Sequence, residues 1–169
     1  PLVLHGSPGM GKTSTLAKFC RDYREERPGA FVLSHFVGSA PGSTDIRHTL
    51  HRICSILLEE YELEDEVDLP QTYDELKLLF PRILELCAFG RPLVICLDSL
   101  NALSDNHRAH SLEWLPHTQH LAVPVIVSTY TDSKSFEAVK PRLPTPPMVV
   151  LLGMPEEERK QLVRVALFE

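Results

Sequence analysis

Short apolar runs alternate with stretches of helical periodicity along most of the chain. The runs cover residues 2–5, 31–36, 92–97, 123–129 and 148–152, and each has the length of a strand. Apolar residues three or four positions apart predict helices over residues 12–26, 46–58 and 72–87. A further helix is expected between the third and fourth strands, and a last one from Pro155. This alternation predicts a parallel α/β sheet with helices on both faces.

Three details refine this pattern. The run 92–97 is continuously apolar, which is typical of a strand that is buried on both faces. Ser43 or Thr44 is the expected cap of the second helix, because a hydroxyl there can accept from an unpaired backbone N–H. Four prolines between Pro141 and Pro147 predict a loop before the last strand.

Composition and charge narrow the class of protein. The chain has 169 residues, of which 43% are hydrophobic and 24% charged, as in an ordinary folded domain. Its formal charge of −6 argues against a basic surface for nucleic acid or membranes, and no apolar stretch is long enough to span a bilayer. The chain begins at Pro1 without a methionine and ends in a helical pattern, so we expect a piece of a longer protein.

The first strand leads into a phosphate-binding motif. Residues 6–13, GSPGMGKT, match the P-loop pattern G-x-x-x-x-G-K-[ST] with a strand before it and a helix after it. Successive backbone N–H groups in such a loop surround an anion, and the helix presents its positive end to it. Lys12 adds a charge for the β- and γ-phosphates, and the Thr13 hydroxyl can ligate Mg²⁺. The alternative is a glycine-rich turn without a ligand. The expected nucleotide-binding residues are Gly6, Ser7, Pro8, Gly9, Met10, Gly11, Lys12, Thr13 and Ser14.

A second anchor for Mg²⁺ is expected where the third strand ends. Asp98 follows the apolar run LVICL, which is the form of a Walker B strand. Because ligands collect at the carboxyl ends of parallel strands, Asp98 is expected to meet Thr13 there. The predicted metal ligands are therefore Thr13 and Asp98, and the alternative for Asp98 is an ordinary aspartate in a turn.

Other polar residues close neighbouring strands. Ser128 and Thr129 end the fourth strand, where they are expected to sense the γ-phosphate or hold the attacking water; the alternative is unremarkable polar strand ends. His35 ends the second strand and is a weaker candidate at the same edge. Three histidine pairs spaced i, i+3 lack a third metal ligand, so they are interpreted as surface residues: His48/His51, His107/His110 and His117/His120. No Asn-Lys-x-Asp motif is present, which favours adenine over guanine.

The segments LVICLDSLNAL, VPVIVSTY and SHFVG, together with the P-loop, resemble the NACHT-type domains of STAND NTPases. The resemblance covers most of the chain. It implies a three-layer α/β/α fold with strand order 5-1-4-3-2, and ATP or ADP with Mg²⁺ as cofactors. It also implies a nucleotide-binding core over residues 1–152, with residues 153–169 as the first helix leading into a helical lid.

The resemblance also implies a cellular role, partners and a location. It implies a signalling or scaffolding role in a multidomain protein, with protein partners bound through TPR, WD40 or ankyrin repeats and with nucleotide-dependent self-association. Direct nucleic-acid binding is not expected. The implied location is the cytoplasm, with the cilium as the alternative.

Two departures from the family pattern bear on hydrolysis. Asn101 and Ala102 stand where the family carries acids, and Tyr130 stands where many members carry arginine. Asn101 is then the expected water-positioning residue, and since an amide cannot take a proton, ATP hydrolysis should be slow. The function predicted is an ATP-binding switch with slow turnover. The alternatives are a degenerate interaction scaffold and a P-loop kinase, although residues 99–122 contain only Arg108 as an arginine for a kinase lid.

Overall fold

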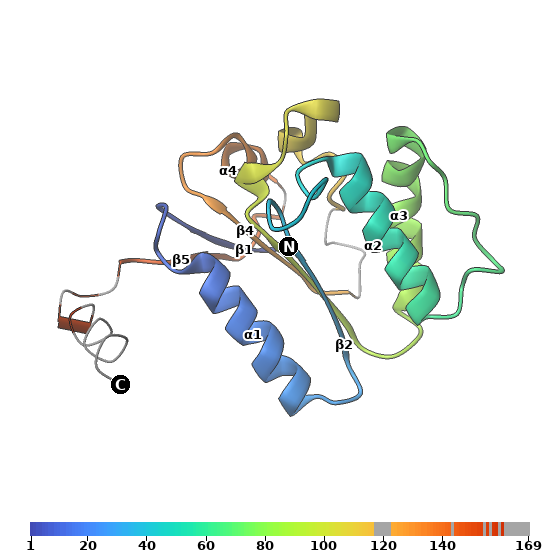
Figure 1. The fold of residues 1–169 in the computed structure, drawn as a ribbon, viewed down its shortest axis with the longest axis horizontal. Coiled ribbons are helices and arrows are strands. Elements are labelled where there is room, and N and C mark those ends of the chain that lie inside the picture. The colour runs from blue at the N-terminus through green and yellow to red at the C-terminus, as the bar shows by residue number, and fades with distance from the viewer. Residues whose placement is uncertain (117–122, 143, 154, 156, 159, 161–169) are drawn as a thin grey trace.

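A computed structural model describes residues 1–116, 123–142, 144–153, 155, 157–158 and 160 (Figure 1). Five parallel strands form one sheet in the order β2-β3-β4-β1-β5. Read from the other edge, this is the predicted order 5-1-4-3-2, so the predicted fold class is confirmed. The strands are β1 (Leu2–Gly6), β2 (Phe31–Phe36), β3 (Leu93–Asp98), β4 (Val125–Tyr130) and β5 (Met148–Val150).

Helices cover both faces of the sheet. Helix α1 (Lys12–Glu26) lies on one face, and α2 (Ile46–Glu60) and α3 (Tyr73–Cys87) lie on the other (Figure 1). The short helix α4 (Lys134–Val139) precedes β5, and two 3-10 turns, η1 (Leu100–Ala102) and η2 (Asn106–Ser111), follow β3. The part of the chain described here has no helix with both the length and the apolar character needed to cross a membrane.

Strand β3 lies at the centre of the core. All six of its residues are buried, as its continuous apolar run predicts. Val94 and Cys96 pack with Leu16 and Cys20 of α1 in a small cluster. The alternate β3 residues Leu93, Ile95 and Leu97 join a much larger cluster on the side of α2 and α3. The alternation of side chains along one strand therefore supplies both hydrophobic layers.

The cap of α2 differs from the sequence prediction. Asp45, rather than Ser43 or Thr44, is the N-cap, and its Oδ1 accepts from the backbone N–H of His48 at 3.0 Å. Ser43 does not cap the helix, because its hydroxyl oxygen accepts from the N–H of Gly38 in the preceding loop at 2.9 Å. Three consecutive residues can cap a helix, and the loop's own hydrogen bonds decide which one does so.

Two connections also differ. Between β3 and β4, the expected helix is replaced in the described residues by the turns η1 and η2. Between β4 and β5, the expected loop contains α4, which Ser133 caps by accepting from the N–H of Phe136. A helix of six residues is too short to give a periodic signal, and the prolines that suggested a loop follow it.

Some sequence predictions lie outside the described residues. His117 and His120 belong to this group. Most of the helix expected from Pro155, and with it most of segment 153–169, also falls there, although residues 157, 158 and 160 are described and helical.

Candidate nucleotide-binding site

The P-loop connects the end of β1 to the start of α1. Gly9 and Gly11 have φ values of 77° and 82°, a left-handed conformation that other residues adopt only with strain. Gly6 is needed for a different reason, because a Cβ at this position would lie 2.6 Å from the carbonyl oxygen of Leu151. The glycines of the motif therefore fix both the curvature of the loop and its close approach to the chain after β5.

The N-terminus of α1 is open. Gly11 is its N-cap and supplies no side-chain hydrogen bond, and the first turn contains no acidic residue. The first N–H groups of a helix have no partner within the helix, and together with the helix dipole they favour an anion. Ser7, Pro8 and Gly9 of the loop are exposed in front of this end. The arrangement suits a phosphate group.

Lys12 is folded back on the loop. Its Nζ donates to the carbonyl oxygens of Gly6 at 2.9 Å and Ser7 at 2.8 Å, and only 6% of the residue is exposed. The ammonium also lies 4.6 Å from the centre of the Tyr130 ring, within the range of a cation–π contact. Burial lowers the pKa of Lys12, and the carboxylate of Asp98 opposes this shift.

Asp98 lies beside the start of α1, bonded to Thr13. The Thr13 hydroxyl donates to Asp98 Oδ2 at 2.7 Å, although 85 residues separate the two in sequence. Ser99 donates to the same oxygen at 3.0 Å, and Ser128 donates to Oδ1 at 2.5 Å. Asp98 is 2% exposed, so these hydroxyls hold a buried carboxylate in one orientation. A carboxylate and a hydroxyl are oxygen ligands of the kind that Mg²⁺ binds, and they stand next to the phosphate-binding loop.

The three predicted catalytic residues have different surroundings. Ser128 is completely buried behind Asp98, and its oxygen also accepts from the N–H of Ser99 at 2.9 Å. Thr129 is 1% exposed and shares a hydrogen bond of 2.7 Å with the hydroxyl of Ser133, the α4 cap. Asn101 is half-buried, and its Oδ1 accepts from the N–H of Tyr130 at 3.2 Å. Ser128 therefore contacts the proposed metal ligand, whereas Thr129 contacts α4.

Tyr130 and Ser99 are contacts that the sequence did not assign to the site. Tyr130 holds Lys12 through its ring, and its backbone N–H is held by Asn101. Ser99 has a left-handed φ of 59° and orients the Asp98 carboxylate. For Tyr130 the available signal was that it stands where many family members carry arginine, and for Ser99 it was position alone, directly after Asp98 at the end of a buried strand.

The remaining candidate ligands lie elsewhere. His35 is buried at the end of β2 and contacts Thr49 and Arg52 rather than the P-loop. His110 bonds to Ser135, and the ring of His107 stacks on Tyr73. Among the described residues, no group of three or more His, Cys, Asp or Glu side chains could hold a metal ion.

Comparison with known proteins places this geometry in a family. The model of the AAA ATPase domain matches residues 1–128. A TPR repeat-containing protein of Dictyostelium discoideum is 24% identical over 98% of this chain and 12% of its own length. NACHT and WD repeat domain-containing protein 2 of Mus musculus is 33% identical over 76% of this chain and 8% of its own length. Human nephrocystin-3 is 27% identical over 79% of this chain and 10% of its own length. The chain thus spans about a tenth of these relatives, which include the NACHT class that its sequence resembles.

Solved structures agree on the fold. The Orc1 protein of Aeropyrum pernix, solved in complex with DNA, matches with a TM-score of 0.56 and 18% identity, over 97% of this chain and 42% of that one. AMPPCP-bound DnaA of Aquifex aeolicus matches with a TM-score of 0.50 and 15% identity, over 99% of this chain and 44% of that one. The strand order, the P-loop and the family match lead to one conclusion: this chain belongs to the family of AAA ATPase domains and is a nucleotide-binding P-loop domain.

Proposed function

We propose that this domain binds Mg·ATP and Mg·ADP and acts as a nucleotide-dependent switch with slow ATP hydrolysis. The observation that carries the proposal is the 2.7 Å bond between Thr13 and Asp98, beside a helix N-terminus that no side chain caps. The open N–H groups are suited to phosphate oxygens, and the hydroxyl and carboxylate are suited to the metal. A bound Mg²⁺ would supply positive charge to the phosphates.

Lys12 is the residue that we expect to report the bound state. Its ammonium is satisfied by two loop carbonyls and the Tyr130 ring. These are neutral partners, and a phosphate oxygen is a stronger acceptor for a charged donor. We therefore expect Lys12 to leave one or both carbonyls when phosphate binds, which would also loosen its contact with Tyr130. Tyr130 ends β4 and is followed by α4, so this contact offers a path from the nucleotide to the next element.

Slow hydrolysis follows from the residues around Asp98. Their side chains are hydroxyls and an amide, which can orient a water but cannot accept its proton at neutral pH. Asp105, the next acid along the chain, forms an ion pair with Lys134 at 2.9 Å, and the same carboxylate oxygen lies 3.6 Å from His110 Nε2. A long-lived ATP state suits a switch, in which neighbouring domains respond to the bound nucleotide.

The wider role is inferred from the relatives. Their names contain TPR or WD repeats, so we propose that repeats in the parent protein bind protein partners. Nucleotide-dependent self-association is the second mode of interaction that we propose. The net charge of −6 favours proteins over nucleic acid as partners. A cytoplasmic or ciliary location is proposed on the resemblance alone.

The proposal is tested by titrating labelled ATP and ADP onto the protein with and without Mg²⁺, while phosphate release is measured in parallel. Lys12→Ala should abolish ATP binding and leave the melting temperature within a few degrees of the wild type. Lys18→Ala is the matched control, because Lys18 lies on the same helix but is exposed and pairs with Asp22. Unchanged ATP affinity in Lys12→Ala would refute nucleotide binding at this loop. Rapid turnover by the wild type would refute the slow switch.

A further inference from the structure

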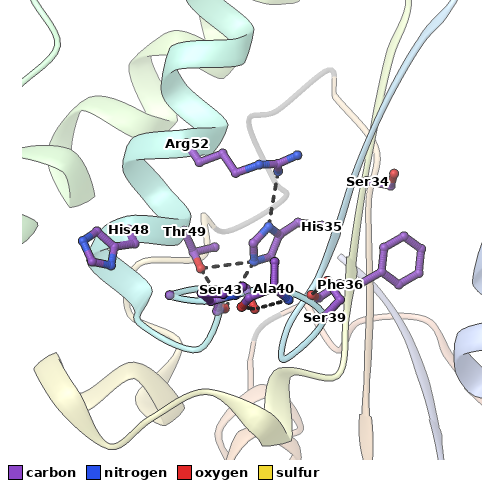
Figure 2. Close-up of a pocket in the computed structure, with 11 residues that line it drawn as sticks. Ser34, His35, Phe36, Ser39, Ala40, Ser43, His48, Thr49 and Arg52 are labelled. Carbon is purple, nitrogen blue, oxygen red and sulfur yellow. Dashed lines mark hydrogen bonds between the residues drawn. The ribbon is translucent and has the colours of Figure 1, made fainter.

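A second hollow lies at the carboxyl edge of the sheet, where β2 ends. It encloses about 310 Å³ and is lined by eleven residues, among them His35, Ser39, Ser43, Thr49 and Arg52 (Figure 2). These residues come from the end of β2, from the loop that follows it and from the first turns of α2. The segment SHFVG, which the proposed nucleotide site does not use, contributes Ser34, His35 and Phe36 to the lining.

His35 is held in one protonation state by a directed chain of hydrogen bonds. Arg52 can only donate, so its Nη1, 3.3 Å from His35 Nδ1, makes that ring nitrogen an acceptor. The other ring nitrogen, Nε2, then carries the proton and donates to Thr49 Oγ1 at 3.2 Å. The Thr49 hydroxyl donates to the carbonyl of Ser43 at 3.2 Å. Burial lowers the pKa of His35, the hydrogen bond with the Ser43 carbonyl partly opposes this shift, and the charge of Arg52 lowers the pKa further.

Arg52 gives the pocket its charge. It extends from α2 across His35, whereas the ring of His48 points away from this group (Figure 2). Among the described residues that line the pocket none is acidic, and Arg52 is the one with a permanent charge. Within the same part of the chain the exposed guanidinium bonds only to His35, so its other N–H groups have no acceptor there. The nearest capping acid, Asp45, directs its carboxylate at the N–H of His48.

The loop beneath Arg52 is closed by hydrogen bonds of Ser43. The Ser43 oxygen accepts from Gly38 N at 2.9 Å and Ala40 N at 3.3 Å, and its hydroxyl donates to Ala40 O at 2.6 Å. Gly38 and Gly42 adopt left-handed φ values of 85° and 77°, which let the chain turn back on itself. The floor of the pocket is therefore formed in advance, and little ordering is needed when a ligand binds.

We propose that this pocket binds a small organic anion, whose carboxylate or phosphate group pairs with the guanidinium of Arg52. Arginine presents parallel N–H groups that match the two oxygens of such an anion, and His35 fixes one end of that fork. The volume lies at the lower end of the range of small-molecule sites, which suits a metabolite rather than a protein segment. β2 is three strands from β1, so these two strands lie about 14 Å apart, and the described residues that line the pocket include none of the P-loop, Thr13 or Asp98.

The test measures anion binding by calorimetry in the full chain carrying Lys12→Ala, so that phosphate does not report the P-loop. Inorganic phosphate and pyrophosphate form one arm, and succinate and citrate form the other, which distinguishes the two anion classes. At least one arm should bind with half-saturation below about 1 mM, the equivalent of roughly −4 kcal/mol. A second series uses the wild type saturated with Mg·ATP, which covers the case in which Lys12→Ala fails to fold.

Arg52→Gln should weaken this binding at least tenfold, and Arg52→Lys should recover only part of it, because a lysine lacks the fork. Arg47→Gln is the matched control on the same helix, since its guanidinium contacts Gln71 and His48 and does not line the pocket. Equal binding by wild type and Arg52→Gln would overturn the proposal. The proposal would also be overturned if none of the four anions bound at concentrations up to about 10 mM. If instead the wild type failed to bind ATP while anion binding stayed intact, the result would count against the proposed nucleotide site and not against this pocket.

Discussion

Two strand–loop–helix units of this domain are built alike but differ at the N-terminus of the helix. β1 leads through the P-loop to α1, and β2 leads through residues 37–45 to α2. Each loop contains two left-handed glycines, and each helix is 15 residues long. The difference lies at the helix N-terminus: α1 has no side-chain cap, whereas α2 is capped by Asp45.

The difference shows what an anion must contact in each unit. In the second loop, the hydroxyl of Ser43 takes the N–H groups of Gly38 and Ala40, and Asp45 takes that of His48. Backbone donors that the protein has already satisfied cannot bind a ligand, so recognition there must come from a side chain, namely Arg52. In the first loop no side chain caps the helix N-terminus, so its N–H groups remain for the phosphate. Substitutions should therefore affect the two sites independently, since no side chain is shared between them.

The largest effect is expected on ATP hydrolysis, when an acid is introduced at Asn101 in the proposed nucleotide site. Asn101→Asp keeps an oxygen acceptor for the N–H of Tyr130, the residue whose ring contacts Lys12, and adds a carboxylate at the position that we expect to orient the attacking water. General-base catalysis typically contributes 10²- to 10⁴-fold, so single-turnover hydrolysis should rise by roughly 10²-fold. The measurement is phosphate release from a single pre-bound ATP, with ATP affinity determined on the same sample.

The comparison for this variant is Ala102→Asp, which places the same charge at the other position where the family pattern carries an acid, one residue further along and exposed. A gain that appears only in Ala102→Asp would contradict the assignment of Asn101. A brisk wild-type rate that Asn101→Asp leaves unaltered would contradict the prediction of slow turnover. Anion binding in the β2 pocket should be the same in both variants, because neither residue lines it.

A smaller effect is expected from Asp98, the proposed metal ligand of the nucleotide site. Asp98→Asn removes the charge that Thr13, Ser99 and Ser128 orient, while it preserves size and one oxygen acceptor. Changes around a metal site typically cost 10- to 100-fold in metal affinity, so we expect Mg²⁺ to tighten ATP binding roughly 10- to 100-fold less in the variant. ATP affinity without Mg²⁺ should be nearly unchanged, because the P-loop is intact. An equal loss with and without the metal would show that Asp98 acts on the fold instead.

The sequence specified the parts of the molecule that depend on local pattern. The P-loop is a contiguous motif, and the continuous apolar run 92–97 could form little other than a central strand. The neighbours of Lys12 could not be predicted in this way. Its contact with Tyr130 joins residues 118 positions apart and depends on the register of β1 against β4, in which Gly6 pairs with Tyr130.

Competition between neighbouring groups limited the other predictions. Ser43, Thr44 and Asp45 can each cap a helix, and the choice among them was settled by the loop that Ser43 closes. His35 was expected at the nucleotide edge because it ends a strand. Alternation along β2 instead turns it toward α2, where Thr49 and Arg52 lie. Strand ends can be read from a sequence, whereas the face that each one presents depends on packing.

The smallest effect is expected from the cap of α2, in the unit that runs from β2 through residues 37–45 to α2. Asp45→Ala should lower the free energy of unfolding by about 1 kcal/mol at neutral pH, the usual cost of losing an N-cap, and should leave ATP affinity unchanged. Burial raises the pKa of Asp45, but hydrogen bonds, including that from the N–H of His48, outweigh it and hold the pKa below its ordinary value of 3.8. A carboxylate whose pKa is lower in the folded chain stabilises it fully above about pH 4, and this contribution is lost as the pH falls through the folded-state pKa.

The difference in stability between wild type and Asp45→Ala should therefore shrink below about pH 4 in urea unfolding curves. Asp45→Asn is the matched control, because asparagine caps about as well without a charge, so its stability should match the wild type at neutral pH and exceed it in acid. A deficit in Asp45→Ala that is the same at every pH would show that packing rather than the carboxylate is responsible. If Asp45→Ala also gained anion affinity that survived Arg52→Gln, the freed N-terminus of α2 would itself be binding the anion, and the contrast between the two units would rest on this one cap.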